Sequence, residues 1–249
     1  MPDFRSDYEL GRSPVLRELE CCVLGCAYGA TSWTTRREVS RIAEMLALGP
    51  HDRLLDVGAG SGWPGLYLAQ LADCDVVLVD LPLVGLQVAQ ERAIAEGLAL
   101  RCRFVAASGA ALPFNDGLFD AVSHSDVLCC LPEKEAVLRA CRRVGRVGAK
   151  MVFSVIAPAP SLSQAARSIA IESGPPFVDV SGDYGDLLAE SGWDLVERLD
   201  VTEEFARTLR ASIDGMNART EAITDVVVAN SPRACSAGGT RSPASNAEC

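Results

Sequence analysis

A glycine-rich turn is the part of this chain whose residue types and spacing could do chemistry. The turn follows an apolar run, and the segment reads Leu54-Leu55-Asp56-Val57-Gly58-Ala59-Gly60-Ser61-Gly62. Glycine adopts positive φ at little cost and lets a ligand lie directly against the main chain. A helical pattern starts at Trp63, and a helix N-terminus presents unpaired N–H groups to a bound group. The segment therefore predicts a strand, a tight turn and a helix that hold a nucleoside or nucleotide.

The elements that must position this turn alternate between strands and helices. The predicted strands are Leu54–Val57, Val76–Val79, Arg103–Ala106, Phe119–Ser123 and Met151–Val155. The predicted helices between them are Pro64–Leu71, Leu83–Glu96 and Glu133–Val144. This alternation is typical of an α/β fold, a parallel sheet with helices on both faces. Ligands of such sheets bind beyond the carboxyl ends of the strands, where the strand order reverses, and we expect the turn there.

The flanking segments divide the chain into three regions. Residues 1–50 show helical spacing, with Thr34-Thr35 as a candidate cap, and residues 51–230 form the α/β domain with an insertion at 157–180. Residues 231–249 are rich in Ser, Pro, Gly and Ala and are predicted to be a disordered tail. Late in the domain we expect a helix at Tyr184–Ser191, a strand at Trp193–Val201, a helix at Glu203–Ile223 and a final strand at Thr224–Asn230.

Composition excludes several classes of partner. The formal net charge is −10 and no basic stripe is present, which argues against a nucleic-acid partner. The ten cysteines include no C-x-x-C pair and are accompanied by only two histidines, so we expect no metal site. Reduced thiols favour a cytoplasmic location. No apolar run is long enough to span a bilayer, and the first residues lack the apolar core of a signal peptide.

One interpretation of the turn is a dinucleotide site. Gly60-Ser61-Gly62-Trp63-Pro64-Gly65 matches G-x-G-x-x-G, and Asp80 ends a predicted strand about 20 residues later, as a nicotinamide-binding fold requires. Two features oppose it. The first glycine of that register lies too far beyond the strand, and the Trp63 indole would crowd a pyrophosphate. An NAD-dependent oxidoreductase therefore stays an alternative.

The register that starts at Gly58 fits a different family. Its spacing, with an acid at the end of the next strand, resembles the first motif of the class I S-adenosylmethionine-dependent methyltransferases. Four further segments resemble later motifs of that family: Val76–Leu81, Phe104–Phe114, Phe119–Val122 and Arg142–Val155. Together the motifs cover roughly residues 50–156. Among its branches, the chain looks most like the ubiquinone/menaquinone-biosynthesis-like enzymes, which act on small molecules.

The resemblance implies a Rossmann-like, doubly wound, mostly parallel sheet and S-adenosylmethionine as the cofactor. The glycines, with Ala59, would allow backbone approach, and Asp56 would lie near the methionine amine or fix the turn. Asp80 would bind the ribose hydroxyls, since a carboxylate accepts two hydrogen bonds from a diol. The remaining expected cofactor contacts are Leu81, Ala107 and Ser108. Ser108 departs from the family, which often has Asp there.

The resemblance also makes residues 1–50 a helical lid, with Tyr28 and Trp33 closing the site. The family sheet usually ends in an antiparallel pair of strands, of which only the first, Trp193–Val201, is clear in this sequence.

His124 is the only candidate for acid–base catalysis. It follows the fourth predicted strand, in the polar segment Ser123–Asp126, and we expect it at the entrance of the crevice. It could act as a general base or orient the acceptor, because histidine titrates near neutral pH. The alternative is a histidine hydrogen-bonded to loop backbone.

The function implied by the resemblance is methyl transfer from S-adenosylmethionine to a small-molecule acceptor by in-line displacement. Such a transfer needs alignment and exclusion of water, and a base only where the acceptor must lose a proton. Besides the oxidoreductase, a member that binds the cofactor without turning it over stays open.

Overall fold

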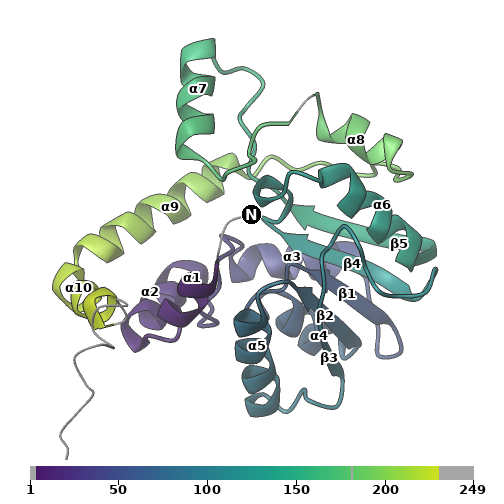
Figure 1. Ribbon diagram of the computed structural model, residues 1–249, viewed down its shortest axis with the longest axis horizontal. Coiled ribbons are helices and arrows are strands. Elements are labelled where there is room, and N and C mark those ends of the chain that lie inside the picture. Colours follow the sequence, from purple (N-terminus) through teal and green to yellow (C-terminus); the bar gives the residue numbers. More distant parts are fainter. Residues whose placement is uncertain (1–3, 181, 230–249) are drawn as a thin grey trace, which may run out of the picture.

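A five-stranded parallel sheet lies at the centre of the computed structural model, which describes residues 4–180 and 182–229 (Figure 1). Its strands are β1 (Arg53–Val57), β2 (Asp75–Asp80), β3 (Cys102–Ala106), β4 (Phe119–Ser125) and β5 (Gly145–Ser154). The strand order is β3-β2-β1-β4-β5, and every neighbouring pair is parallel. The five strands predicted in this region are confirmed. The order reverses between β1 and β4, so the ligand crevice is expected beyond the ends of these two strands.

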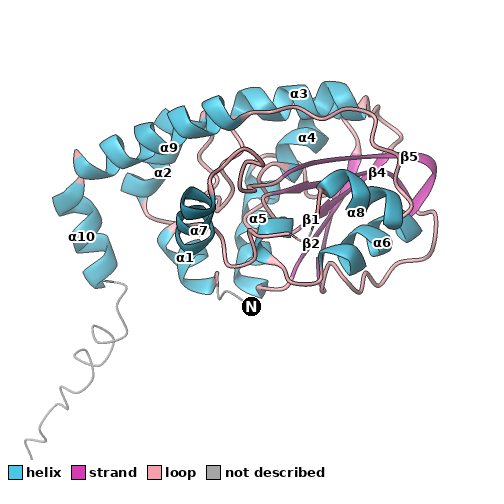
Figure 2. Ribbon diagram, turned by 90° about the horizontal axis from the view of Figure 1, so that it is seen from above, coloured by secondary structure: helices cyan, strands magenta, loops and turns pink. Residues whose placement is uncertain are grey.

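The two faces of the sheet are covered because strand residues alternate in direction. Leu54, Val76 and Leu78 pack in one buried cluster with α3 (Arg36–Leu46), α4 (Gly65–Ala72) and α5 (Leu83–Ala95). Leu55, Val79 and their neighbours pack in the other with α6 (Lys134–Val144) and α8 (Tyr184–Glu190). Figure 2 shows α3 and α4 on one side of the strands and α6 and α8 on the other. The predicted doubly wound fold is therefore confirmed.

The helices before β1 are α1 (Arg5–Leu10), α2 (Pro14–Leu24) and α3. The candidate cap is confirmed at Thr35, whose hydroxyl accepts from the Glu38 amide while the Glu38 carboxylate accepts from the Thr35 amide. This reciprocal arrangement satisfies two helix-terminal donors. The connection from α2 to α3 crosses the end of the sheet, and α1 packs on α5.

The chain after β5 is mostly helical. The predicted insertion contains α7 (Gln164–Ser173), which stands away from the sheet and buries none of its residues (Figure 1). Two long helical segments follow α8, namely α9 (Thr202–Asn217) and α10 (Thr220–Ala229), and both pack on α2. The single helix predicted at Glu203–Ile223 is thus divided by a short turn.

The two late strands were predicted wrongly. Residues 193–200 form no regular element; Trp193 is buried and its indole N–H donates to the Leu138 carbonyl, whereas Val196 is 96% exposed. A strand exists only through hydrogen bonds to a neighbour, and the described sheet ends at β5.

The Thr224–Asn230 segment is helical to Ala229 despite its β-branched valines, because α10 packs on α2 and α9. Asn230 and the tail predicted at 231–249 lie outside the described residues. Within the described ranges, no helix is long and apolar enough to cross a membrane.

Candidate functional site

The glycine turn leaves β1 at the reversal point of the sheet and depends on left-handed backbone. Gly58, Gly60 and Gly62 have φ of 68°, 50° and 97°. The turn is tied to the end of β2, because the amides of Gly58 and Ala59 both donate to the Val79 carbonyl, at 2.8 and 3.0 Å. Ala59 itself is buried. A Cβ at Gly58 would run into Val127, which follows β4. Glycine is therefore needed here for close approach as well as for its φ.

Asp80 organises the open side of the turn from the end of β2. Its Oδ2 accepts from the Gly60 amide at 2.7 Å, and its Oδ1 accepts from the Leu81 amide at 2.7 Å. Burial raises the pKa of the Asp80 carboxyl, while the hydrogen bonds from Gly60, Leu81 and Tyr8 act against that rise. Each oxygen of a carboxylate has two lone pairs, so Asp80 can accept further hydrogen bonds from a ligand.

A cavity of about 110 Å³ lies over the turn and Asp80. Its walls come from α1, the loop before α3, the ends of β1 and β2, the loop after β3 and the segment after β4. Of the cofactor residues expected from the sequence, Gly58, Asp80, Leu81, Ala107 and Ser108 line it. The structure thus brings together residues that lie up to about fifty positions apart in the sequence.

Asp56 lies beneath the turn. It is 1% exposed and does not line the cavity. Its Oδ1 accepts from the Ser123 hydroxyl at 2.7 Å, and a Cβ at Gly65 would run into its Oδ2. Burial raises the pKa of the Asp56 carboxyl to about 7, against the hydrogen bond from Ser123. Of its two expected roles, this position supports fixing the turn.

Ser108 is engaged by its own loop. Its hydroxyl accepts from the Ala110 amide at 3.2 Å, and its carbonyl accepts from the Ala111 amide. The preceding Ala107 amide donates to the Asp80 carbonyl at 3.0 Å. The serine therefore shapes a tight turn at the cavity wall, and its hydroxyl proton remains able to donate to a ligand.

Tyr8 is a site residue that the sequence reasoning missed. It is 4% exposed, and its hydroxyl donates to Asp80 Oδ2 at 3.4 Å. A Cβ at Gly60 would lie 2.7 Å from the Tyr8 hydroxyl oxygen. Burial raises the pKa of this phenol, and the Asp80 charge raises it further, so Tyr8 stays protonated as a donor. A tyrosine in a short polar segment gives no sequence signal for such a position.

The two aromatic residues expected to close the site do not line the cavity. Tyr28 is 6% exposed, stacks beneath the Arg92 guanidinium at 4.0 Å and donates from its hydroxyl to Glu96. The Trp33 ring instead contacts Phe205 of α9, with ring centroids 5.9 Å apart. The loop reaches the cavity through the preceding residues Thr31 and Ser32.

The Trp63 side chain also points away from the ligand side of the turn. It is 3% exposed in the core, and its indole N–H donates to the Thr34 carbonyl at 2.7 Å. The steric objection to a dinucleotide at this residue was therefore wrong. The objection from glycine spacing is unaffected, since Gly58 directly follows β1.

His124 was expected at the entrance of the crevice, and this placement is wrong. The residue lies within β4, is fully buried and stacks on Phe153 of β5, with ring centroids 4.5 Å apart. Neither ring nitrogen has a hydrogen-bond partner among the residues that the structure describes. Burial lowers the pKa of the imidazole to about 3. The side chain is therefore neutral near pH 7 and is enclosed by other side chains of the core.

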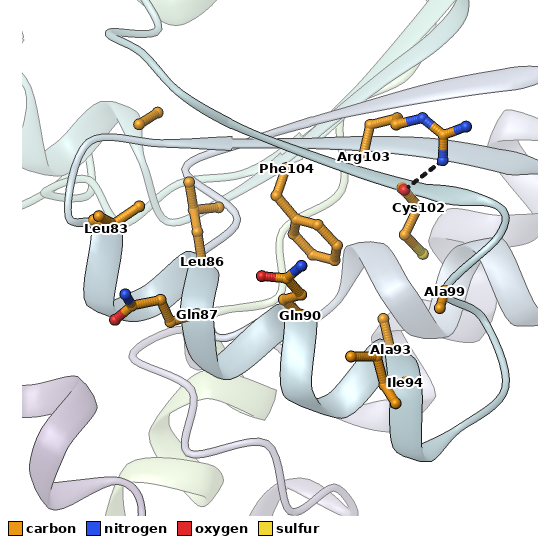
Figure 3. Close-up of a pocket in the computed structure, with 11 residues that line it drawn as sticks. Leu83, Leu86, Gln87, Gln90, Ala93, Ile94, Ala99, Cys102, Arg103 and Phe104 are labelled. Carbon is orange, nitrogen blue, oxygen red and sulfur yellow. Dashed lines mark hydrogen bonds between the residues drawn. The ribbon is translucent and has the colours of Figure 1, made fainter.

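A larger hollow of about 440 Å³ lies elsewhere, between α5 and β3 (Figure 3). Its walls are mainly aliphatic, with Phe104 from β3 and the amides of Gln87 and Gln90 from α5. It includes neither the glycine turn nor any carboxylate. The smaller cavity, with converging amides and a carboxylate, is therefore the candidate site.

The segment from β1 to β5, whose strand ends and loops form most of this site, also matches a known protein family. A family model described as "Methyltransferase domain" matches residues 55–153, from β1 to β5. Phosphoethanolamine N-methyltransferase 3 of Arabidopsis thaliana is 29% identical over 179 residues, which are 72% of this chain and 36% of that protein. The 27-O-demethylrifamycin SV methyltransferase of Amycolatopsis mediterranei is 30% identical over 173 residues, covering 68% of this chain and 64% of that protein. The chain thus spans less than two thirds of either relative.

Solved structures show the same architecture. Phosphoethanolamine N-methyltransferase 2 of Haemonchus contortus, solved with S-adenosyl-L-methionine, has a TM-score of 0.71 at 18% identity. The match covers 95% of this chain and 54% of that one. At this identity the likeness shows the fold, which agrees with the Rossmann-like class expected from the sequence.

Proposed function

We propose that this chain, which belongs to the class I S-adenosylmethionine-dependent methyltransferases, transfers the methyl group of that cofactor to a small-molecule acceptor. The observation that carries the proposal is the position of the Asp80 carboxylate. It fixes the Gly60 and Leu81 amides at the reversal point of the sheet and lines the cavity there. The ubiquinone/menaquinone-like branch stays a prediction, because the named relatives act on phosphoethanolamine and a rifamycin.

The residues around the cavity fit this cofactor. Asp80 would accept hydrogen bonds from the ribose diol, and Leu81, Ala107 and Ser108 would enclose the adenine. Gly58, Gly60 and Gly62 would let the amino-acid part lie against the backbone, with Asp56 holding the turn from below. When bound, the cofactor supplies an electrophilic methyl group on a sulfonium. The chain has to align the acceptor with that group and exclude water.

The cavity must widen before the cofactor can enter. Pockets for ligands of this size are typically about 300–1,000 Å³, whereas this one is about 110 Å³. Tyr8 of α1 lies over Gly60 and Asp80, so α1 is the element whose displacement would uncover the turn. This is consistent with residues 1–50 acting as a helical lid, although Tyr28 and Trp33 would act through packing.

The charges at the cavity favour an acceptor without a phosphate. Carboxylates of Asp80, Asp126 and Glu133 line it, and none of its described lining residues is Lys or Arg. A phosphate ester is normally bound by such cations or by several converging amides. We therefore infer a neutral or cationic acceptor. Turnover of a hydroxylated polyketide or a simple secondary amine should exceed turnover of phosphoethanolamine, and the reverse order would contradict the inference.

Ligand-dependent stability tests the cofactor. A saturating ligand that binds only the folded state stabilises it by about 2.7 kcal/mol at 100 times its Kd. S-adenosylmethionine and its demethylated product should raise Tm in the wild-type protein, and Asp80→Asn should lose most of that rise. Glu91→Gln, an exposed carboxylate on α5, is the matched control. Stabilisation by NAD alone would support the oxidoreductase instead.

Turnover separates the remaining alternative. Release of the demethylated product is measured across an acceptor panel that includes small alcohols, phenols and amines. Release that depends on acceptor and on Asp80 supports a methyltransferase. Binding of the cofactor without release on any acceptor would indicate a member that has lost catalysis. The cytoplasmic location and the lack of a nucleic-acid partner remain predictions from composition.

A further inference from the structure

Asp126 is a polar residue of the cavity whose carboxylate is hydrogen-bonded to two other segments. The chain leaves β4 there with a φ of 57°, which is uncommon for a residue other than glycine. This turn directs the carboxylate back across the end of the sheet. Its Oδ2 accepts from the Ser32 hydroxyl at 3.0 Å and the Trp33 amide at 2.9 Å. Its Oδ1 accepts from the Ser154 hydroxyl of β5 at 2.9 Å.

The contacts of Asp126 therefore join three segments that are far apart in the sequence. Residues 31–34 precede α3, Asp126 follows β4, and Ser154 ends β5. The Asp126 amide also donates to the Ser154 carbonyl at 3.1 Å, which fixes the carboxylate to the sheet. Hydrogen bonds that a carboxylate accepts from side-chain and backbone donors are stronger than neutral hydrogen bonds in the same positions. An uncommon φ persists where surrounding contacts over-determine it.

Residues 31–34 form one wall segment, of which Thr31 and Ser32 line the cavity. Asp126 accepts hydrogen bonds from Ser32 and Trp33 of this segment. At the other end of the same four residues, the Thr34 carbonyl accepts from the Trp63 indole, which belongs to the turn. The wall is thus attached to the turn at Thr34 and to the strand ends at Ser32 and Trp33. Loss of the Asp126 contacts would release the end that faces the ligand.

We propose that Asp126 is a positioning residue, which acts by fixing residues 31–34 as the wall that closes the cofactor cavity. The proposal rests on the proposed function for the identity of the ligand. Its structural part, the attachment of the wall, can be measured without any ligand. Asp126 differs in this role from Asp80, which faces the ligand through its own free lone pairs.

Hydrogen exchange of the ligand-free protein is the first measurement. The Trp33 amide donates to Asp126, so Asp126→Ala should speed its exchange by about tenfold or more, the factor that corresponds to one lost hydrogen bond. Asp126→Asn keeps a carbonyl-type acceptor and should restore most of the protection. Ser154→Ala removes a donor on the sheet side and should affect the Trp33 amide less.

Affinity for S-adenosylmethionine, measured by calorimetry, is the second. Asp126→Ala should weaken binding by about tenfold, and Ser32→Ala should weaken it by a smaller factor, because both substitutions release the wall. Asp126→Asn should again recover most of the affinity. Glu38→Ala is the control for lost stability: it disrupts the cap of α3 and should lower Tm while leaving Trp33 exchange and affinity unchanged. If Asp126→Ala fails to fold, Ser32→Ala carries the test.

Two results would overturn the proposal. One is unchanged Trp33 exchange in Asp126→Ala, which would mean that the carboxylate does not hold the wall. The other is weaker binding in Asp126→Ala with full affinity in Ser32→Ala, which would mean that Asp126 contacts the ligand directly. Failure of the proposed function has a different signature, since the wild-type protein would then not bind S-adenosylmethionine while the exchange results could still show the attachment.

Discussion

A protein with leucine in place of His124 is expected to lose much less stability in acid than the wild-type protein. The imidazole is buried and stacked on Phe153, and no hydrogen-bond partner lies in the described part of the chain. Burial lowers its pKa from 6.5 to about 3. Between these two values the unfolded chain binds a proton that the folded protein does not. Stability therefore falls as pH falls through this window, by about 1.4 kcal/mol per pH unit.

The magnitude follows from the same two values. From about pH 7.5 to about pH 5, protonation of the unfolded His124 should cost the wild-type protein about 2 kcal/mol, and His124→Leu should escape this cost. At neutral pH two terms partly cancel. The variant no longer buries an unsatisfied polar group, a gain of about 1–3 kcal/mol, but it loses a stacked contact of about 0.5–1.5 kcal/mol. We expect the variant to be about 1 kcal/mol more stable there.

Urea denaturation at the two pH values, followed by tryptophan fluorescence, measures the effect. The comparison with wild type cancels the contributions of other groups, including the buried Asp56. His51→Leu is the matched control, because it makes the same substitution at an exposed histidine before β1. Equal losses of stability in wild type and His124→Leu would refute the reasoning. In the turnover assay, lost activity with retained cofactor binding would instead support His124 as a base.

Three other substitutions test the turn and its cover. Gly65→Ala should destabilise the protein by about 1–3 kcal/mol in urea denaturation, because its Cβ would run into Asp56, whereas Gly49→Ala should be nearly neutral. Asp56→Asn should gain stability relative to wild type as pH rises from about 4 to about 7. The Asp56 pKa is raised from 3.8 to about 7, so its proton stabilises the folded wild-type protein at low pH, and this stabilisation is lost as pH rises through that window. Tyr8→Ala should speed association of S-adenosylmethionine in stopped-flow measurements, since the ring covers Gly60; an unchanged rate would argue against displacement of α1.

Local sequence patterns were sufficient to predict those features that depend on residues within one strand or helix and its adjoining turn. The central strands β1 and β2 carry the apolar runs Leu54-Leu55 and Val76–Val79 because a parallel sheet buries both faces, and that signal does not depend on distant partners. The glycines and Asp80 were predictable for the same reason, since a turn that requires positive φ selects glycine locally. The Thr35 cap and its Glu38 partner are likewise a four-residue pattern.

Residues whose environment comes from elsewhere in the chain were not predictable in this way. His124 follows a polar pattern and was expected outside the sheet, but β5 pairs alongside it and Phe153 covers the ring. Trp193–Val201 has the alternation of a strand, yet no described strand pairs with it. The valines of α10 favour strands intrinsically, and packing on α2 makes them helical.

The sequence by itself determined the strands, the glycine turn and the acid at the end of the next strand. Each of these depends on backbone conformation and side-chain type within a few residues. Only the tertiary structure decided that Tyr8 covers the turn, that His124 is in the core, and that Asp126 holds residues 31–34. Those outcomes depend on which distant segments meet at the strand ends, and hydrogen bonds between distant segments leave no periodic trace in the sequence.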